Sequence, residues 1–160
     1  MRRREFITLL GGAAASWPLA ARAQQPMPVV GLLLGSSAAV LGPQIAAFHE
    51  GLRQAGFAEG HNVAVQYRYT EGQLDRFPAL ASDLVDRGVA VIVAGTPTGA
   101  LAAKQATRTI PIVFTIGSDP VEMGLVASLN SPGGNLTGVY QFSAGLEPKR
   151  LGPGPPPSRR

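Results

Sequence analysis

The chain has 160 residues, with 14 Lys+Arg, 10 Asp+Glu, a formal net charge of +4 and no cysteine. This composition excludes disulfides, thiolate catalysis, Cys-based metal sites and a lipid-anchoring cysteine from the sequence. The two histidines, His49 and His61, do not have the spacing of metal ligands. We therefore predict neither a metal nor a cofactor.

Residues 1–23 have the features of an export signal. Arg3 and Arg4 begin a twin-arginine pattern, a run of apolar and small residues follows, and Ala21-Arg22-Ala23 offers a cleavage site. We expect cleavage after Ala23 and a periplasmic protein. Four arginines and one glutamate leave with the signal, which takes the net charge from +4 to +1. No basic surface with interleaved aromatics remains, so we predict no nucleic-acid partner.

The first half of the remaining chain predicts a strand, a helix and a second strand. Residues 29–34 form a short apolar run typical of a strand buried on both faces. Ile45, Phe48 and Leu52 recur at helical spacing, and Gly56 supplies a helix stop. Residues 63–69 alternate between apolar and polar, which predicts a half-exposed strand near a sheet edge.

The second half continues the same alternation. A helical stripe runs from Leu74 to Val85, and buried strands are predicted at 89–94 and 112–116, with a fifth strand at 136–140. Thr96-Pro97 predicts a helix start with Thr as N-cap. Asp119, Pro120 and Glu122 predict another helix start through a capping box.

Strand–helix alternation with short connections predicts the α/β class. We expect a doubly wound parallel sheet with helices on both faces, in one domain spanning residues 28–145. Residues 146–160 are rich in Pro and Gly after Leu151, and we expect them to be a disordered tail.

Small hydroxyl residues follow three of the predicted strands. In a doubly wound sheet, ligands bind beyond the carboxyl ends of the strands, and helix N-termini there favour anions. The alternative is that these residues serve only as helix N-caps. The candidate ligand-binding residues in these three loops are Ser36, Ser37, Thr96, Thr98, Ser118 and the neighbouring carboxylate Asp119.

Sequence signatures of common enzymes are absent. The chain has no G-x-G-x-x-G, no P-loop and no G-x-S-x-G elbow. We therefore predict a protein without enzymatic activity.

The order and spacing of several segments resemble the solute-binding proteins of bacterial ABC importers, in the branch similar to aromatic and branched-chain amino-acid binders with the type I periplasmic-binding fold. The segments are 3–13 (RREFITLLGGA), 48–52 (FHEGL), 56–63 (GFAEGHNV), 110–114 (IPIVF), 117–121 (GSDPV) and 131–139 (SPGGNLTGV).

This resemblance implies a two-lobed protein of about twice this length that closes around a small ligand. Because helix N-termini favour anions, we expect that ligand to carry a carboxylate, as an amino acid does. It implies a flavodoxin-like strand order in the lobe seen here and a membrane permease as partner. The loops after the first, third and fourth strands would line the cleft. Tyr140 and Gln141 would lie near the hinge, and Tyr140 is a further candidate ligand-binding residue.

The chain departs from the family after residue 145. Residues 146–151 resemble the start of a crossover helix, but the sequence then turns to Pro and Gly and stops. We interpret this as truncation after the first lobe, which would leave half a cleft. Two alternatives remain at this point: a small exported flavodoxin-like enzyme or cofactor-binding domain, and an inactive relic.

Overall fold

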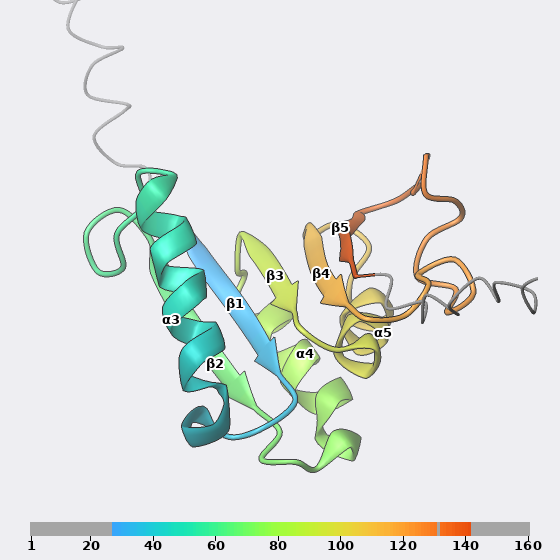
Figure 1. Cartoon of the computed structure of the whole chain (residues 1–160), viewed down its shortest axis with the longest axis horizontal. Helices are drawn as coiled ribbons and strands as arrows, with labels where there is room; N and C mark the ends of the chain where they lie inside the picture. Colours follow the sequence, from blue (N-terminus) through green and yellow to red (C-terminus); the bar gives the residue numbers. More distant parts are fainter. Residues whose placement is uncertain (1–26, 131, 142–160) are drawn as a thin grey trace, which may run out of the picture.

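The computed structural model describes residues 27–130 and 132–141 (Figure 1). The predicted signal at 1–23 and the predicted tail at 146–160 lie outside these residues, so both stay predictions. The described residues hold all five predicted strands.

The sheet has five strands, all parallel, in the order β2-β1-β3-β4-β5. This arrangement confirms the predicted doubly wound sheet with flavodoxin-like order. The strand predicted at 63–69 is an edge strand, as its half-exposed pattern indicates. The strands are β1 (Val29–Leu34), β2 (Ala64–Tyr69), β3 (Val91–Ala94), β4 (Ile112–Ile116) and β5 (Leu136–Tyr140).

Helices lie on both faces of the sheet, as expected (Figure 1). Helix α3 (Ala38–Gln54) covers one face; α4 (Phe77–Asp86), preceded by the 3-10 turn η1 (Leu74–Arg76), and α5 (Pro97–Ala106) cover the other. Leu33 faces α4 and α5, whereas Leu32 faces α3, because side chains alternate along a strand. Within the described residues, no helix combines the length and apolar character needed to cross a membrane.

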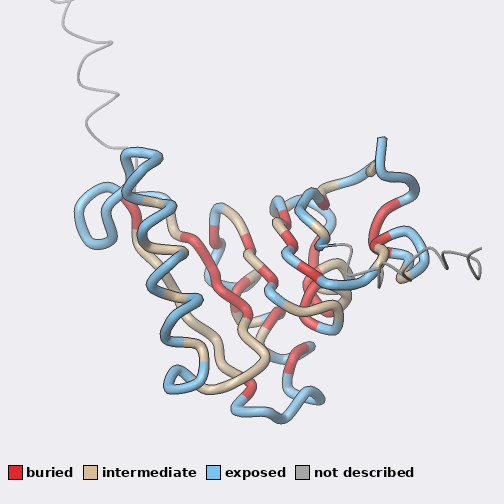
Figure 2. Tube along the Cα trace, in the orientation of Figure 1, coloured by how far each residue is buried: buried red, intermediate tan, exposed pale blue. Residues whose placement is uncertain are grey.

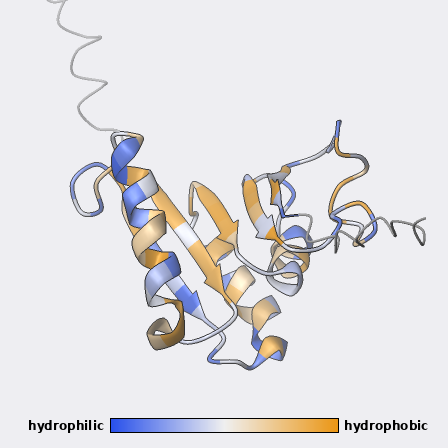
Figure 3. Cartoon of the chain, in the orientation of Figure 1, coloured by the Kyte–Doolittle hydropathy of each residue, from blue (hydrophilic) through white to orange (hydrophobic). Residues whose placement is uncertain are grey.

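The two faces are covered unequally. The core beneath α4 and α5 is fully buried at Phe77, Ala81 and Leu84, whereas α3 has no buried residue. Figure 2 shows this contrast along the two sides of the sheet, and Figure 3 shows that the central strands are strongly hydrophobic. Helix α3 therefore shields only part of an apolar sheet face.

The helix predicted to begin at Asp119 is absent, and the chain makes a short turn there instead. The Asp119 carboxylate does accept the backbone N–H groups of Val121 and Glu122, at 2.7 and 3.3 Å. Gly124, however, adopts a φ of +66°, which L side chains rarely take, and ends the turn. Leu125 then enters the core, where it is 1% exposed. Burial of this apolar residue directs the chain inward instead of along a helix.

A polar cluster that the sequence did not predict ties α3 to the edge strand β2. The Tyr67 hydroxyl lies 2.6 Å from His49 Nε2 and donates to Glu59 at 3.2 Å. Burial, followed by the nearby Glu59 carboxylate, raises the pKa of Tyr67 to about 12. The Tyr67 hydroxyl thus connects α3 at His49 to the turn at Glu59.

Gly138 lets β5 pack closely on β4. A Cβ at this position would lie 2.1 Å from the Phe114 carbonyl oxygen, a backbone atom that cannot move freely. We expect Gly138→Ala to lower the free energy of unfolding by about 3 kcal/mol or more through overpacking. Gly51→Ala is the control, because a Cβ there meets no atom within 4 Å on exposed α3. It should raise stability by about 0.5–1 kcal/mol. Urea denaturation followed by circular dichroism measures both, and equal effects would contradict this packing.

Candidate functional site

The parallel sheet brings every candidate residue to its carboxyl edge. Strands β1, β3, β4 and β5 are consecutive neighbours, and their ends are aligned, with Leu33 beside Ala94 and Ile116 beside Tyr140. Loops 35–37, 95–96 and 117–119 therefore leave the sheet side by side. Residues separated by more than 100 positions in sequence share one edge.

The loop after β1 leads into the N-terminus of α3. Ser37 is the N-cap residue by its extended backbone, but its side chain makes no capping hydrogen bond. Both Ser36 and Ser37 are half-buried, and the first turn of α3 has no acidic side chain. The first-turn N–H groups and the helix dipole thus create a positive potential at the start of α3. No acidic side chain in that turn neutralises it.

In the loop after β3 the N-cap side chain does form a capping hydrogen bond, because Thr96 caps α5 as predicted. Its hydroxyl oxygen accepts a hydrogen bond from the Gly99 N–H at 3.1 Å. Thr98, in the first turn, is exposed and takes no part in the cap. A Cβ on Gly35 would lie 2.9 Å from the Thr96 methyl group, so glycine allows these two loops to pack against each other.

The loop after β4 contributes Ser118 and Asp119. Ser118 is exposed and Asp119 is half-buried. Both backbone hydrogen bonds to Asp119 go to Oδ1, and no hydrogen bond within the described residues uses Oδ2. The edge therefore has two helix N-termini, not the three expected from the sequence, together with one carboxylate.

Tyr140 ends β5 and is half-buried. It lines a cavity of about 190 Å³ together with Phe114, Pro120 and Gly138. Gln141 follows it and donates its N–H to the Ile116 carbonyl at 2.9 Å, which extends the β4–β5 ladder by one bond. This cavity places Tyr140 beside the turn that holds Asp119.

An apolar groove between α3 and the sheet was not predicted. It has a volume of about 370 Å³ and reaches the carboxyl edge at Leu34, Gly95 and Thr115. Strand alternation shows which residues face α3, but only packing shows how much of that face the helix leaves open. The remaining lining residues are Leu32, Gln44, Ile45, Phe48 and Val93.

Residues 38–145 match the family model of the ABC transporter substrate-binding proteins. The chain belongs to this family. The match covers all elements from α3 to β5, which include most of the carboxyl edge. The family prediction made from the sequence segments is confirmed.

Two proteins with stated ligands are similar to this chain. A tyrosine-binding protein from Clostridioides difficile (strain R20291) is 35% identical over 95 residues, which cover 59% of this chain and 28% of that protein. A solved domain from Streptococcus pneumoniae in complex with L-Trp has a TM-score of 0.65 at 27% identity, covering 72% of this chain and 39% of that one.

Two further solved structures share the fold. One is the ligand-free, open form of a substrate-binding protein with adhesive properties from Clostridium difficile, with a TM-score of 0.66 at 29% identity. The other is a conserved domain protein from Vibrio cholerae, with a TM-score of 0.69 at 31% identity. The chain covers only 39% and 40% of these two structures, although 72% and 74% of its own residues align.

The capping role of Thr96 can be tested by mutation. We expect Thr96→Ala to lower the free energy of unfolding by about 1 kcal/mol, because the Gly99 N–H loses its acceptor. Thr96→Ser keeps the hydroxyl and should restore most of that loss. Thr98→Ala, one turn position away and outside the cap, should leave stability within about 0.5 kcal/mol of the parent. Thermal denaturation tests this order, and a Thr98 effect as large as that of Thr96 would contradict it.

Proposed function

We propose that the carboxyl edge of the sheet binds the carboxylate of an amino acid. The observation that carries this proposal is the uncapped N-terminus of α3, where free N–H groups and two serine hydroxyls meet with no acidic residue in the first turn. A relative that binds tyrosine and a neighbour in complex with L-Trp support this ligand class.

Asp119 fits the other charged group of an amino acid. Its Oδ1 is held by two backbone N–H groups, which fixes the carboxylate and leaves Oδ2 for an incoming donor. An ammonium group is the natural partner of such an oxygen. The edge therefore offers a positive region at α3 and a negative group after β4, as a zwitterion requires.

The apolar groove beside Gly95 offers a place for the side chain of the ligand. Its volume of about 370 Å³ falls in the usual range for small-molecule sites, and its walls are largely aliphatic and aromatic. We infer that aromatic amino acids bind more tightly than glycine, because only they bury an apolar side chain in the groove.

We expect L-tryptophan to bind this chain with a Kd in the millimolar range, about −4 kcal/mol. The edge is open to solvent at Thr98 and Ser118, so a ligand bound there keeps part of its contact with water. Tryptamine, which lacks the carboxylate, and glycine, which lacks the side chain, should each bind at least tenfold more weakly. An NMR-detected titration of the purified chain measures all three.

Removing single hydroxyl groups shows where on the sheet edge the ligand binds. Ser36→Ala and Ser37→Ala should each weaken L-tryptophan binding at least threefold, because each removes a hydroxyl group from the start of α3. Ser82→Ala is the matched control, since Ser82 is an exposed hydroxyl residue on α4, away from this edge. Equal affinity for L-tryptophan and tryptamine would contradict the carboxylate assignment.

We further propose that the protein acts outside the cytoplasm, without enzymatic activity, as the ligand-binding partner of an ABC permease. The family supports this role. The amino-terminal sequence supports export, through Arg3, Arg4 and the site ending at Ala23.

Export by the twin-arginine route depends on the arginine pair. Replacing both residues, Arg3→Lys and Arg4→Lys, should lower the periplasmic fraction at least fivefold and leave uncleaved precursor in the cytoplasm. Arg22→Lys lies beside the cleavage site and outside the pair, so it serves as the control. Cell fractionation with immunoblotting measures the amounts. An unchanged periplasmic fraction in the double variant would overturn the route.

A further inference from the structure

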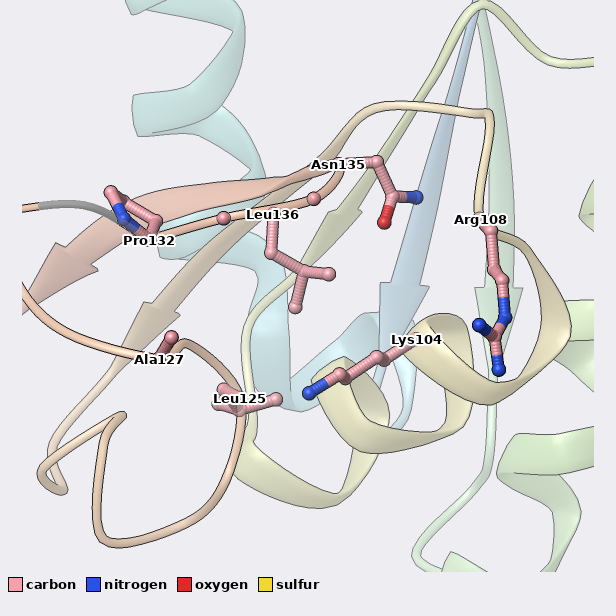
Figure 4. Close-up of a pocket in the computed structure, with 9 residues that line it drawn as sticks. Lys104, Arg108, Leu125, Ala127, Pro132, Asn135 and Leu136 are labelled. Carbon is pink, nitrogen blue, oxygen red and sulfur yellow. The ribbon is translucent and has the colours of Figure 1, made fainter.

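A pocket at the opposite edge of the sheet lies beyond the C-terminal end of α5 (Figure 4). It has a volume of about 390 Å³ and is lined by Lys104, Arg108, Asn135 and Leu136, among others. Helix α5 begins at the proposed amino-acid site and spans about 15 Å at 1.5 Å per residue. This pocket is therefore separate from that site.

The pocket is positively charged. Lys104 and Arg108 line it, and none of its lining residues is acidic. Neither cation forms an ion pair within the described residues, where the arginines that do are Arg53, Arg68 and Arg87. In Figure 4 the Lys104 side chain extends from α5 toward Leu125, whereas the Arg108 side chain extends from the loop after α5, and Asn135 and Leu136 lie on the strand side.

The stability of α5 explains the position of Lys104 but not that of Arg108. Lys104 lies in the last turn of α5, where a positive charge is favourable, and its Nζ donates to the Gly124 carbonyl at 2.5 Å. Arg108 lies two residues beyond the end of the helix, is exposed, and makes no hydrogen bond or ion pair within the described residues. Its guanidinium is left available for an anion from outside the chain.

Apart from Asn135 and two glycines, the rest of the lining is apolar. Leu125 and Leu136, which are 1% and 5% exposed, line it together with Ala127 and Pro132. A volume of about 390 Å³ suits a small molecule. Cations beside an apolar wall favour a ligand that carries both an anionic group and a hydrocarbon part, because inorganic anions leave the wall unused.

We propose that this pocket is a second ligand site, which binds a small organic anion with an apolar body through Arg108 and Lys104. The site does not depend on amino-acid binding at the carboxyl edge. Hexanoate is the probe, with inorganic phosphate, hexanol and hexylamine as comparisons. The measurement is a ¹H–¹⁵N NMR titration of the full chain.

Hexanoate should produce saturable shifts in residues 104–108, 125–127 and 132–136. Inorganic phosphate and hexanol should each bind at least threefold more weakly, and hexylamine should cause no shift there. The variant carrying Lys104→Gln and Arg108→Gln should bind hexanoate at least tenfold more weakly. A control carrying Arg53→Gln and Arg87→Gln loses the same charge elsewhere and should bind normally.

The single variant Arg108→Gln is expected to fold normally, because Arg108 has no partner within the described residues. The hydrogen bond from Lys104 to Gly124 stays intact in this variant. It should weaken hexanoate binding at least threefold with an unchanged spectrum elsewhere. Unchanged hexanoate affinity in this variant, equal binding of hexylamine, or shifts confined to residues 35–37 and 95–98 would each overturn the proposal.

Discussion

The parallel hydrogen-bonded ladder from β1 through β3 and β4 to β5 determines where every candidate binding group lies. Each strand enters the sheet in the same direction, so each carboxyl end opens at the same edge. Close approach between elements makes this alignment possible. Gly35 allows the first two loops to touch, and Gly138 allows β5 to pack on Phe114. A larger side chain at Gly35 would push the first two loops apart, and one at Gly138 would push β5 away from β4.

The charge distribution at the carboxyl edge depends on the different capping of the two helices that begin there, α5 and α3. Thr96 uses its own hydroxyl to satisfy an α5 N–H, whereas Ser37 leaves the first turn of α3 unsatisfied by any side chain. One carboxylate oxygen of Asp119, Oδ1, accepts hydrogen bonds from backbone N–H groups in its own turn. A single edge thus presents a positive helix end and a fixed carboxylate, which is the charge pattern of a site for a zwitterion.

Local sequence signals predicted the strands and the Thr96 cap because both depend on neighbouring residues. Alternation within 63–69 also indicated an edge strand, which the topology confirms. The helix expected at Asp119 was wrong for a specific reason. The capping hydrogen bonds form, but Gly124 and the burial of Leu125 end the turn before a helix can develop. The His49–Tyr67–Glu59 cluster, the groove beside Gly95 and the Arg108 pocket depend on contacts between distant segments, which no local pattern encodes.

The central claim is that one edge of this sheet recognises an amino acid through both of its charged groups. A crystal structure of the chain with L-tryptophan tests it most directly. The account predicts the ligand carboxylate at hydrogen-bond distance from backbone N–H groups at the start of α3, with its ammonium beside Asp119 Oδ2. L-tryptophan bound with its carboxylate away from α3, or bound only at the Arg108 pocket, would contradict the account.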